Sequence, residues 1–302
     1  MGILNRWIES LDYEFRILES CSRFQSPLST CSRCIDSCSE KALTNVDGIP
    51  IIDNDKCTEC GSCIAACPVQ AVEGFLPRRV ISQNKLVVTE KHPPSIKELL
   101  GIYRKGVKTI IYEQTAWNKE WQETVAKACD ILEKINESPF SVQCIEMETE
   151  ERVTRREIFS LWKKEALSTM KHMTPAKWRF NQKELDLSIF YPNYQFTHIS
   201  LNISKCTACK ACQMLCKRNC LQITETEFTI SAQQCTGCLL CQDICPEKAI
   251  TVEEKIQPSV EVAHPLYTKE CKTCKGNYQT LSLNDDKCVM CKKRESFGTF
   301  LK

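Results

Sequence analysis

The chain has 302 residues, a length that usually forms two or more domains rather than one small metal module. It contains 23 cysteines against 9 glycines and 12 prolines, which excludes a low-complexity chain. The formal net charge is +2, so charge alone favours neither nucleic acid nor a membrane surface as a partner.

The first predicted element is an amphipathic helix over residues 1–20. Its apolar residues recur at helical spacing and are Leu4, Trp7, Ile8, Leu11, Phe15 and Leu18. The segment has acidic residues and no uninterrupted apolar core, unlike a secretion signal. No run of the chain reaches the roughly 18 apolar residues of a membrane span. We therefore expect a cytoplasmic protein, in which C-x2-C pairs bind metal more often than they form disulfides.

Most of the cysteines belong to an internal repeat. CTECGSCIAACP begins at Cys57, CTACKACQMLC at Cys206 and CTGCLLCQDICP at Cys235, each with the spacing C-x2-C-x2-C-x3-C. Matching cysteines of neighbouring motifs are 29 residues apart in both halves of the chain, as Cys206 and Cys235 are. A shared period of this length indicates a duplicated structural unit.

One copy of the repeat departs from the others. Leu28 stands where a cysteine is expected three residues before Cys31, and Cys21 lies seven residues further upstream, across the loop FQSPLST. A loop of that length closes at modest entropic cost, so Cys21 can replace the missing ligand. The alternative is a three-cysteine site that holds a three-iron cluster or a labile iron.

Residues 85–148 alternate strands and helices, which predicts a small parallel α/β unit. KLVVT, VKTIIYE and FSVQCIE have the pattern of strands, and SIKELLGIYRKG and EWQETVAKACDILEKINES that of helices. No glycine-rich phosphate loop follows a strand. We interpret the unit as a scaffold or docking domain, with a small-ligand or flavin site as the alternative. Cys129 and Cys144 stand alone here and are predicted to lie in its core.

Residues 149–198 are predicted to form a basic helical linker. Eight Lys and Arg lie between Arg152 and Arg179, against Glu157 and Glu165. These basic residues form either the solvated side of a helix that packs on the core or a patch that binds an acidic redox partner.

The tail, residues 265–302, has two C-x2-C pairs separated by 13 residues. Four thiolates from two turns predict a tetrahedral structural zinc site, with rubredoxin-like iron as the alternative. The predicted ligands are Cys271, Cys274, Cys288 and Cys291. The tail has no dense arginine run with interleaved aromatics, so nucleic acid is not an expected partner.

The spacing C-x2-C-x2-C-x3-C-P resembles the bacterial-type ferredoxin motif, and two such motifs in tandem resemble a two-cluster ferredoxin domain. The resemblance covers a first domain at residues 21–76 and a second at 199–256. It implies an α+β fold with two ferredoxin-like dicluster domains, separated by the small α/β unit and followed by a zinc-ribbon-like tail. It also implies that each motif gives three thiolates to one [4Fe–4S] cluster, while its fourth cysteine starts a helix and reaches the other cluster.

Four sites follow from this resemblance. Site 1 would consist of Cys21, Cys31, Cys34 and Cys67. Site 2 would consist of Cys38, Cys57, Cys60 and Cys63. Site 3 would consist of Cys206, Cys209, Cys212 and Cys245. Site 4 would consist of Cys216, Cys235, Cys238 and Cys241.

Two departures from the ferredoxin pattern are visible. Ser39 and Lys217 replace the proline that follows the fourth cysteine, so those helix starts are expected to be less fixed. Cys220 also competes with Cys216 as a ligand. It stands four residues after Cys216, where the other three motifs have Ala42, Ala71 and Ala249. We therefore predict that Cys220 packs as a small apolar residue.

These patterns predict an electron-transfer protein with four [4Fe–4S] clusters and one zinc. No catalytic residues are predicted, so the chain is expected to be an electron carrier or redox subunit serving an oxidoreductase, such as a molybdenum–pterin enzyme by family analogy. The alternatives are a redox enzyme with a flavin in the α/β unit and a zinc-rich interaction module. The sequence leaves open whether electrons can pass directly between the two dicluster domains.

Overall fold

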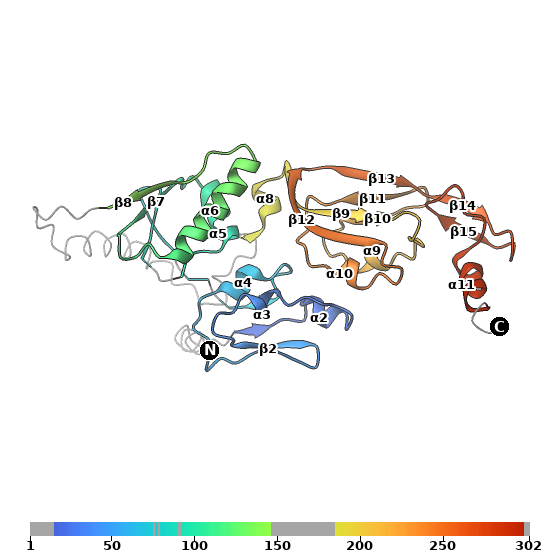
Figure 1. Cartoon of the computed structure of the whole chain (residues 1–302), viewed down its shortest axis with the longest axis horizontal. Helices are drawn as coiled ribbons and strands as arrows, with labels where there is room; N and C mark the ends of the chain where they lie inside the picture. Colours follow the sequence, from blue (N-terminus) through green and yellow to red (C-terminus); the bar gives the residue numbers. More distant parts are fainter. Residues whose placement is uncertain (1–14, 75, 78, 90–91, 146–184, 299–302) are drawn as a thin grey trace, which may run out of the picture.

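The computed structural model describes residues 15–74, 76–77, 79–89, 92–145 and 185–298. Figure 1 shows four parts, which are a first unit (15–77), a middle unit (79–145), a second unit (185–265) and a tail (266–298). The second unit lies between the middle unit and the tail, and helices α3 and α10 approach each other where the first and second units meet. Among the described residues, no helix has the length and apolar character needed to span a bilayer.

The first unit consists of two small antiparallel sheets and three short helices. The hairpin of β2 (Leu43–Val46) and β3 (Ile49–Ile52) turns at Asp47 and Gly48, which both have positive φ. This is the conformation that Asp-Gly hairpins require. Strand β1 (Arg16–Ile17) pairs with β4 (Val72–Glu73). The helices are α2 (Ser22–Gln25), α3 (Arg33–Asp36) and α4 (Ser62–Ala66).

The helix predicted for residues 1–20 does not include its last residues. Arg16 and Ile17 form strand β1, while residues 1–14 lie outside the described part of the chain. Phe15 is 3% exposed and fills the space beside Gly74, where an added Cβ would come within 2.5 Å of its ring. Pairing with β4 and burial of Phe15 therefore override the helical spacing at this end.

The middle unit follows the predicted strand–helix alternation. Strands β6 (Lys85–Val87), β7 (Thr109–Tyr112) and β8 (Ser141–Cys144) are parallel, and β5 (Val80–Ser82), which the sequence did not indicate, adds an antiparallel edge. Helix α5 (Ile96–Arg104) begins with a Ser95–Glu98 capping box, and Asn118 caps α6 (Lys119–Lys134). Both helices bury apolar residues against the sheet.

The two single cysteines of the middle unit differ. Cys129 on α6 is half-buried against the core, whereas Cys144 is exposed on β8. The prediction that Cys144 is a core residue is wrong, because β8 is an edge strand whose four residues are all exposed.

The second unit begins earlier in the chain than predicted. Strand β9 (Tyr194–Leu201) pairs with β12 (Ile250–Pro258), so residues expected in the linker belong to this unit. A second sheet has the order β10 (Leu221–Ile223), β11 (Glu227–Ser231) and β13 (Glu261–Pro265). The helices are α8 (Leu187–Phe190), α9 (Ala211–Leu215) and α10 (Leu240–Asp243). The basic residues of the predicted linker, 152–179, lie outside the described residues.

The tail is a hairpin followed by a helix. Strands β14 (Tyr267–Glu270) and β15 (Asn277–Thr280) are antiparallel, and α11 (Val289–Gly298) closes the chain described here. Lys293 on α11 forms an ion pair of 2.6 Å with Glu247 of the second unit, so the tail lies beside the loop that follows Cys245.

Candidate iron–sulfur and metal sites

Left-handed residues shape the three complete cysteine motifs. The residues on both sides of the second cysteine have φ between 51° and 74° in each motif, and they are Glu59, Gly61, Ala208, Lys210, Gly237 and Leu239. For residues other than glycine this conformation costs roughly 1–2 kcal/mol. In return, it turns the chain so that the N–H of the residue before the second cysteine donates to the sulfur of the first.

All four motifs share a second turn after their last cysteine. The residue three positions later is left-handed in each, and these residues are Lys41, Gln70, Asn219 and Lys248. The N–H of the next residue then donates to the sulfur of the last cysteine at 3.1 to 3.4 Å. The turn is the same where Ser39 and Lys217 replace proline, so proline is not needed to form it.

The last cysteine of each motif follows a short helix instead of starting one. Cys67 comes directly after α4 and Cys216 directly after α9. The expectation of a helix that begins at this cysteine is therefore wrong. The sulfur is oriented by the turn beyond it, whose N–H groups point back at the thiolate.

At site 1 the structure brings Cys21 next to its predicted partners. Burial, together with the charges of Cys67, Cys31 and Cys21, raises the pKa of Cys34 to about 12. The same neighbours, Cys21 and Cys31, act on the buried Cys67. The four sulfurs therefore lie close together, although 46 residues separate the first from the last in the chain.

Arg23 holds the unusual loop of site 1. From helix α2 its guanidinium donates to the carbonyl of Cys31, to that of Thr30 at 3.3 Å and to that of Gly48 at 3.1 Å. Because α2 begins directly after Cys21, this clamp fixes Cys21 and Cys31 relative to each other.

Two serine hydroxyls near Cys21 and Cys31 are buried without a partner in the described part of the chain. Ser22 and Ser29 are buried, and their Oγ atoms have no hydrogen-bond partner among the described residues. A buried hydroxyl without an acceptor is costly. Ser22 lines the cavity of site 4, and the sulfides of an iron–sulfur cluster held there would offer hydrogen-bond acceptors to its hydroxyl.

At site 2 the structure places the fourth cysteine of one motif beside the first three cysteines of the other. Burial raises the pKa of Cys57, and Cys60 and Cys38 add to this by their charge. Burial raises the pKa of Cys63 to about 12, with the largest charge contributions from Cys57 and Cys60. Cys38, from the neighbouring motif, is therefore placed with the three thiols of the second motif.

Sites 3 and 4 show the same exchange and enclose small cavities. The four cysteines of site 3 line a cavity of about 20 Å³, and those of site 4 line one of about 110 Å³. Burial raises the pKa of Cys212 to about 12, and Cys206, Cys209 and Cys245 add to it. Sixteen sulfurs are therefore grouped in four sets of four, the donor number that a [4Fe–4S] cluster takes.

Cys220 is 2% exposed and occupies the same turn position as Ala42, Ala71 and Ala249. Its single S–H can donate to Cys216, to Cys235 or to the carbonyl of Arg218 at 3.8 Å, and the first two contacts lower the pKa of each of these two site 4 cysteines to about 6. Site 4 thus has a hydrogen-bond donor that the alanines cannot supply.

We expect Cys220→Ala to lower the midpoint potential of site 4 by about 20–40 mV, because one weak donor to the sulfurs is lost. Alanine occupies this position in the other three motifs, so the fold should persist. Cys220→Ser should keep or raise the potential. Potentiometric titration followed by EPR measures both. Loss of iron from Cys220→Ala would instead identify Cys220 as a ligand.

The tail cysteines form a different kind of site. Among the described residues, Cys271, Cys274, Cys288 and Cys291 are the group whose ligand atoms all lie within 4.8 Å of one another. The sulfurs of Cys274 and Cys288 are 3.8 Å apart, the separation expected on a tetrahedral ion with metal–sulfur bonds of about 2.3 Å. The N–H groups of Cys274 and Cys288 donate to Cys271 and lower its pKa to about 6. These four thiols fit one ion, whereas the other sets are spaced more widely.

Site 1 and site 4 face each other where the first and second units meet. Thr30 precedes Cys31 and donates its N–H at 2.8 Å and its hydroxyl at 3.0 Å to the carboxylate of Asp243 on α10. Close by, Arg33 on α3 forms an ion pair of 2.7 Å with Glu254 on β12.

Electrostatic interactions between cysteines of different sites show which sites are neighbours. Within the first unit Cys34 acts on Cys63, and within the second unit Cys212 acts on Cys241. Between the units, burial and neighbouring site 4 thiols raise the pKa of Cys238, and Cys31 adds to the effect. The sites therefore follow one another as 2, 1, 4 and 3.

These units and their cysteine loops define a class of protein, the iron–sulfur proteins of the ferredoxin type. Residues 50–73 and 228–251 match the 4Fe-4S binding domain family, and they contain the second motif of each unit. The chain thus carries two 4Fe-4S ferredoxin regions.

The curated relatives match shorter stretches of the chain. Ferredoxin-type protein NapF of Escherichia coli is 36% identical over 72 residues, which are 22% of this chain and 43% of that protein. An uncharacterised ferredoxin of Methanocaldococcus jannaschii is 43% identical over 47 residues, 16% of this chain and 30% of its own length. One component of the ion-translocating oxidoreductase complex of Methanosarcina acetivorans is 40% identical over 43 residues, 14% of this chain and 16% of its own length. The chain spans less than half the length of each.

Proposed function

We propose that this protein transfers single electrons to or from a partner oxidoreductase, with a [4Fe–4S] cluster in each of sites 1 to 4 and zinc in the tail. Each cluster, when bound, accepts and releases one electron at a potential set by hydrogen bonds and burial. The observation that carries the proposal is the order of the sites, because it makes the two ferredoxin units one continuous path.

The chain's own residues support this path in two ways. The Thr30–Asp243 and Arg33–Glu254 contacts fix the first unit against the second. N–H groups and, at site 4, the Cys220 thiol donate to the sulfurs and favour the reduced state. Sites 2 and 3 are the two ends, so we infer that partners dock there.

The alternative of a zinc-rich interaction module has less support. A mononuclear zinc needs its four thiolates nearly in contact, and among the described residues the tail cysteines meet this condition. The wider spacing of the thiols in sites 1 to 4 suits an iron–sulfur cluster better than a single ion. For the partner, the relative that belongs to an ion-translocating oxidoreductase complex supports an oxidoreductase. A molybdenum–pterin enzyme rests on the sequence analogy alone.

Metal analysis of protein purified without oxygen tests the proposal. We expect about 16 iron, about 16 acid-labile sulfide and about one zinc per chain, because four cubanes and one tetrahedral ion require them. Reductive titration should take up about four electrons, one for each cluster. Colourless protein with about five zinc would contradict electron transfer and favour the interaction module.

A further inference from the structure

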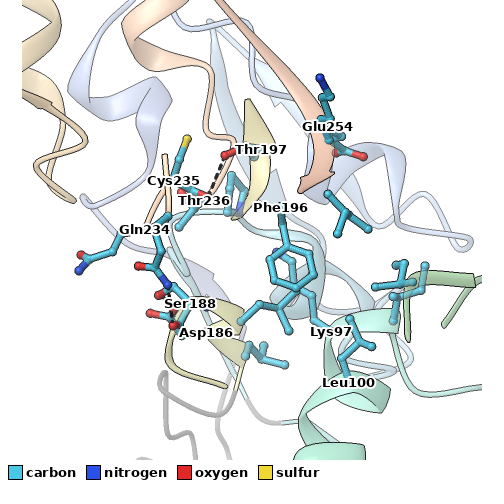
Figure 2. Close-up of a pocket in the computed structure, with 18 of the residues that line it drawn as sticks. Lys97, Leu100, Asp186, Ser188, Phe196, Thr197, Gln234, Cys235, Thr236 and Glu254 are labelled. Carbon is cyan, nitrogen blue, oxygen red and sulfur yellow. Dashed lines mark hydrogen bonds between the residues drawn. The ribbon is translucent and has the colours of Figure 1, made fainter. Parts of the chain in front are cut away.

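A pocket of about 670 Å³ lies where the first, middle and second units meet, and Figure 2 shows part of its lining. Cys67 of site 1 and Cys235 of site 4 both line it. It adjoins the smaller cavity of site 4, with which it shares Pro68, Arg218, Cys235 and Thr236, and has no described lining residue in common with the cavity of site 3. Its volume falls within the range of about 300–1,000 Å³ that is usual for small-molecule sites. We call it the junction pocket.

Apolar side chains form one part of the junction pocket. Figure 2 shows Leu100 of α5 and the ring of Phe196 of β9 on the side of the pocket near Lys97. Further apolar lining residues from the middle and second units are Ile96, Ile131, Leu187 and Ile256. The two units therefore provide an apolar surface against which a planar ring can lie.

The rest of the lining carries a surplus of positive charge. Arg33, Lys97, Lys127, Lys134, Arg218 and Lys255 line the pocket, against Asp130, Asp186 and Glu254. Two of these acids are neutralised, since Arg218 lies 2.7 Å from Asp186 and Arg33 lies 2.7 Å from Glu254. In the described part of the chain the four lysines form no ion pair, and only Asp130 remains to balance them.

The four lysines give this side of the pocket a positive charge that favours an anionic group on a ligand. Lys97 is half-buried on α5, where burial and the charge of Arg33 lower its pKa. Lys127 and Lys134 are exposed on α6, seven residues and therefore about two helical turns apart, which places them on one face. Flexible ammonium groups on one face of a pocket suit a phosphate group.

We propose that the junction pocket binds a phosphate-bearing ligand with a planar redox-active ring, of the flavin mononucleotide class. The lysines hold the phosphate, and the ring lies against Leu100 and Phe196 between Cys67 and Cys235. The two cysteines favour a redox-active ring over an ordinary nucleotide, because each belongs to a set of predicted cluster ligands. This site goes beyond the proposed function, since four clusters carry electrons without it.

Titration of the full-length, cluster-loaded protein with flavin mononucleotide tests this inference, with quenching of flavin fluorescence as the readout. We expect one ligand per chain. Riboflavin, which lacks the phosphate, should bind at least about tenfold more weakly. Lys127→Ala and Lys134→Ala should each weaken binding of flavin mononucleotide by about tenfold. Lys119→Ala is the matched control, because Lys119 is on the same helix but does not line the pocket.

Three outcomes would overturn the inference. They are absence of binding, equal affinity for riboflavin, and affinity that the Lys127 and Lys134 variants leave unchanged. If adenosine monophosphate binds as tightly as flavin mononucleotide, the pocket does not select a redox-active ring, and the inference is replaced by a nucleotide site. The iron count of the same sample is read separately, so failure of the proposed electron-transfer function is not confused with failure of the pocket.

Discussion

Cys21→Ala is expected to lower the iron content from about 16 to between about 12 and 15 per chain. The reason is that the thiol of Cys21 is the fourth sulfur near Cys31, Cys34 and Cys67, and the motif has Leu28 where a ligand is otherwise found. With three thiolates left, the site can keep a three-iron cluster or lose all four irons. Iron and sulfide analysis, together with EPR of the oxidised protein, distinguishes these two results.

The matched control for this variant is Cys144→Ala. Cys144 is exposed on β8 and outside every predicted ligand set, so its removal should leave the iron count unchanged. Equal iron in wild type and Cys21→Ala, at about 15 per chain, would show that site 1 uses three cysteines.

Arg23→Ala tests the loop of site 1 without removing a thiol, because Arg23 holds the loop by hydrogen bonds to its carbonyls. We expect this variant to assemble its cluster more slowly and still to reach full iron occupancy under excess iron and sulfide.

Cys271→Ser is expected to remove the zinc, from about one to near zero per chain, and to unfold the tail while the iron stays at about 16. Apparent binding energies of structural zinc in small peptides reach about 10–16 kcal/mol, which is folding free energy when the apo form has little core. The buried residues of this tail are few: Leu266, Cys271, Thr280, Leu281 and Cys291. Limited proteolysis should therefore cut the variant after residue 265 and spare the wild type.

The same experiment separates zinc from rubredoxin-like iron. Elemental analysis of the wild type that gives about 17 iron and no zinc would replace zinc by iron in the tail. Proteolytic resistance of Cys271→Ser would show that the hairpin and α11 hold together without an ion. Cys144→Ser serves as the control for the loss of a thiol elsewhere.

The equivalence of the cysteine motifs was readable from the sequence, but the turn after their last cysteine was not. The 29-residue interval marks equivalent positions, and the structure forms the same left-handed turn after Cys38, Cys67, Cys216 and Cys245. The structure also has an Asp47–Gly48 hairpin turn before β3 and a Ser95 cap before α5, two features that were not predicted and that form from short local patterns. These features depend on residues a few positions apart, whose conformational preferences act locally.

Other features were not readable because they depend on burial. Helical spacing continues through Phe15, yet Phe15 fills the space beside Gly74 and its neighbours pair with β4. As a lone cysteine in a predicted strand, Cys144 was expected in the core, yet it lies in an exposed edge strand. For Phe15 the deciding contact comes from a segment far away in the chain, whereas for Cys144 the edge position of β8 decides.

The sequence by itself determined which cysteines group into motifs, where the α/β unit lies and that the tail has four thiols for one ion. Only the tertiary structure brings Cys21 close to Cys34 and Cys67 and sets site 1 against site 4. The contact between Thr30 and Asp243 joins residues 213 positions apart, and the junction pocket takes its lining from three units. No local pattern encodes such contacts, because they follow from how separately formed surfaces pack against one another.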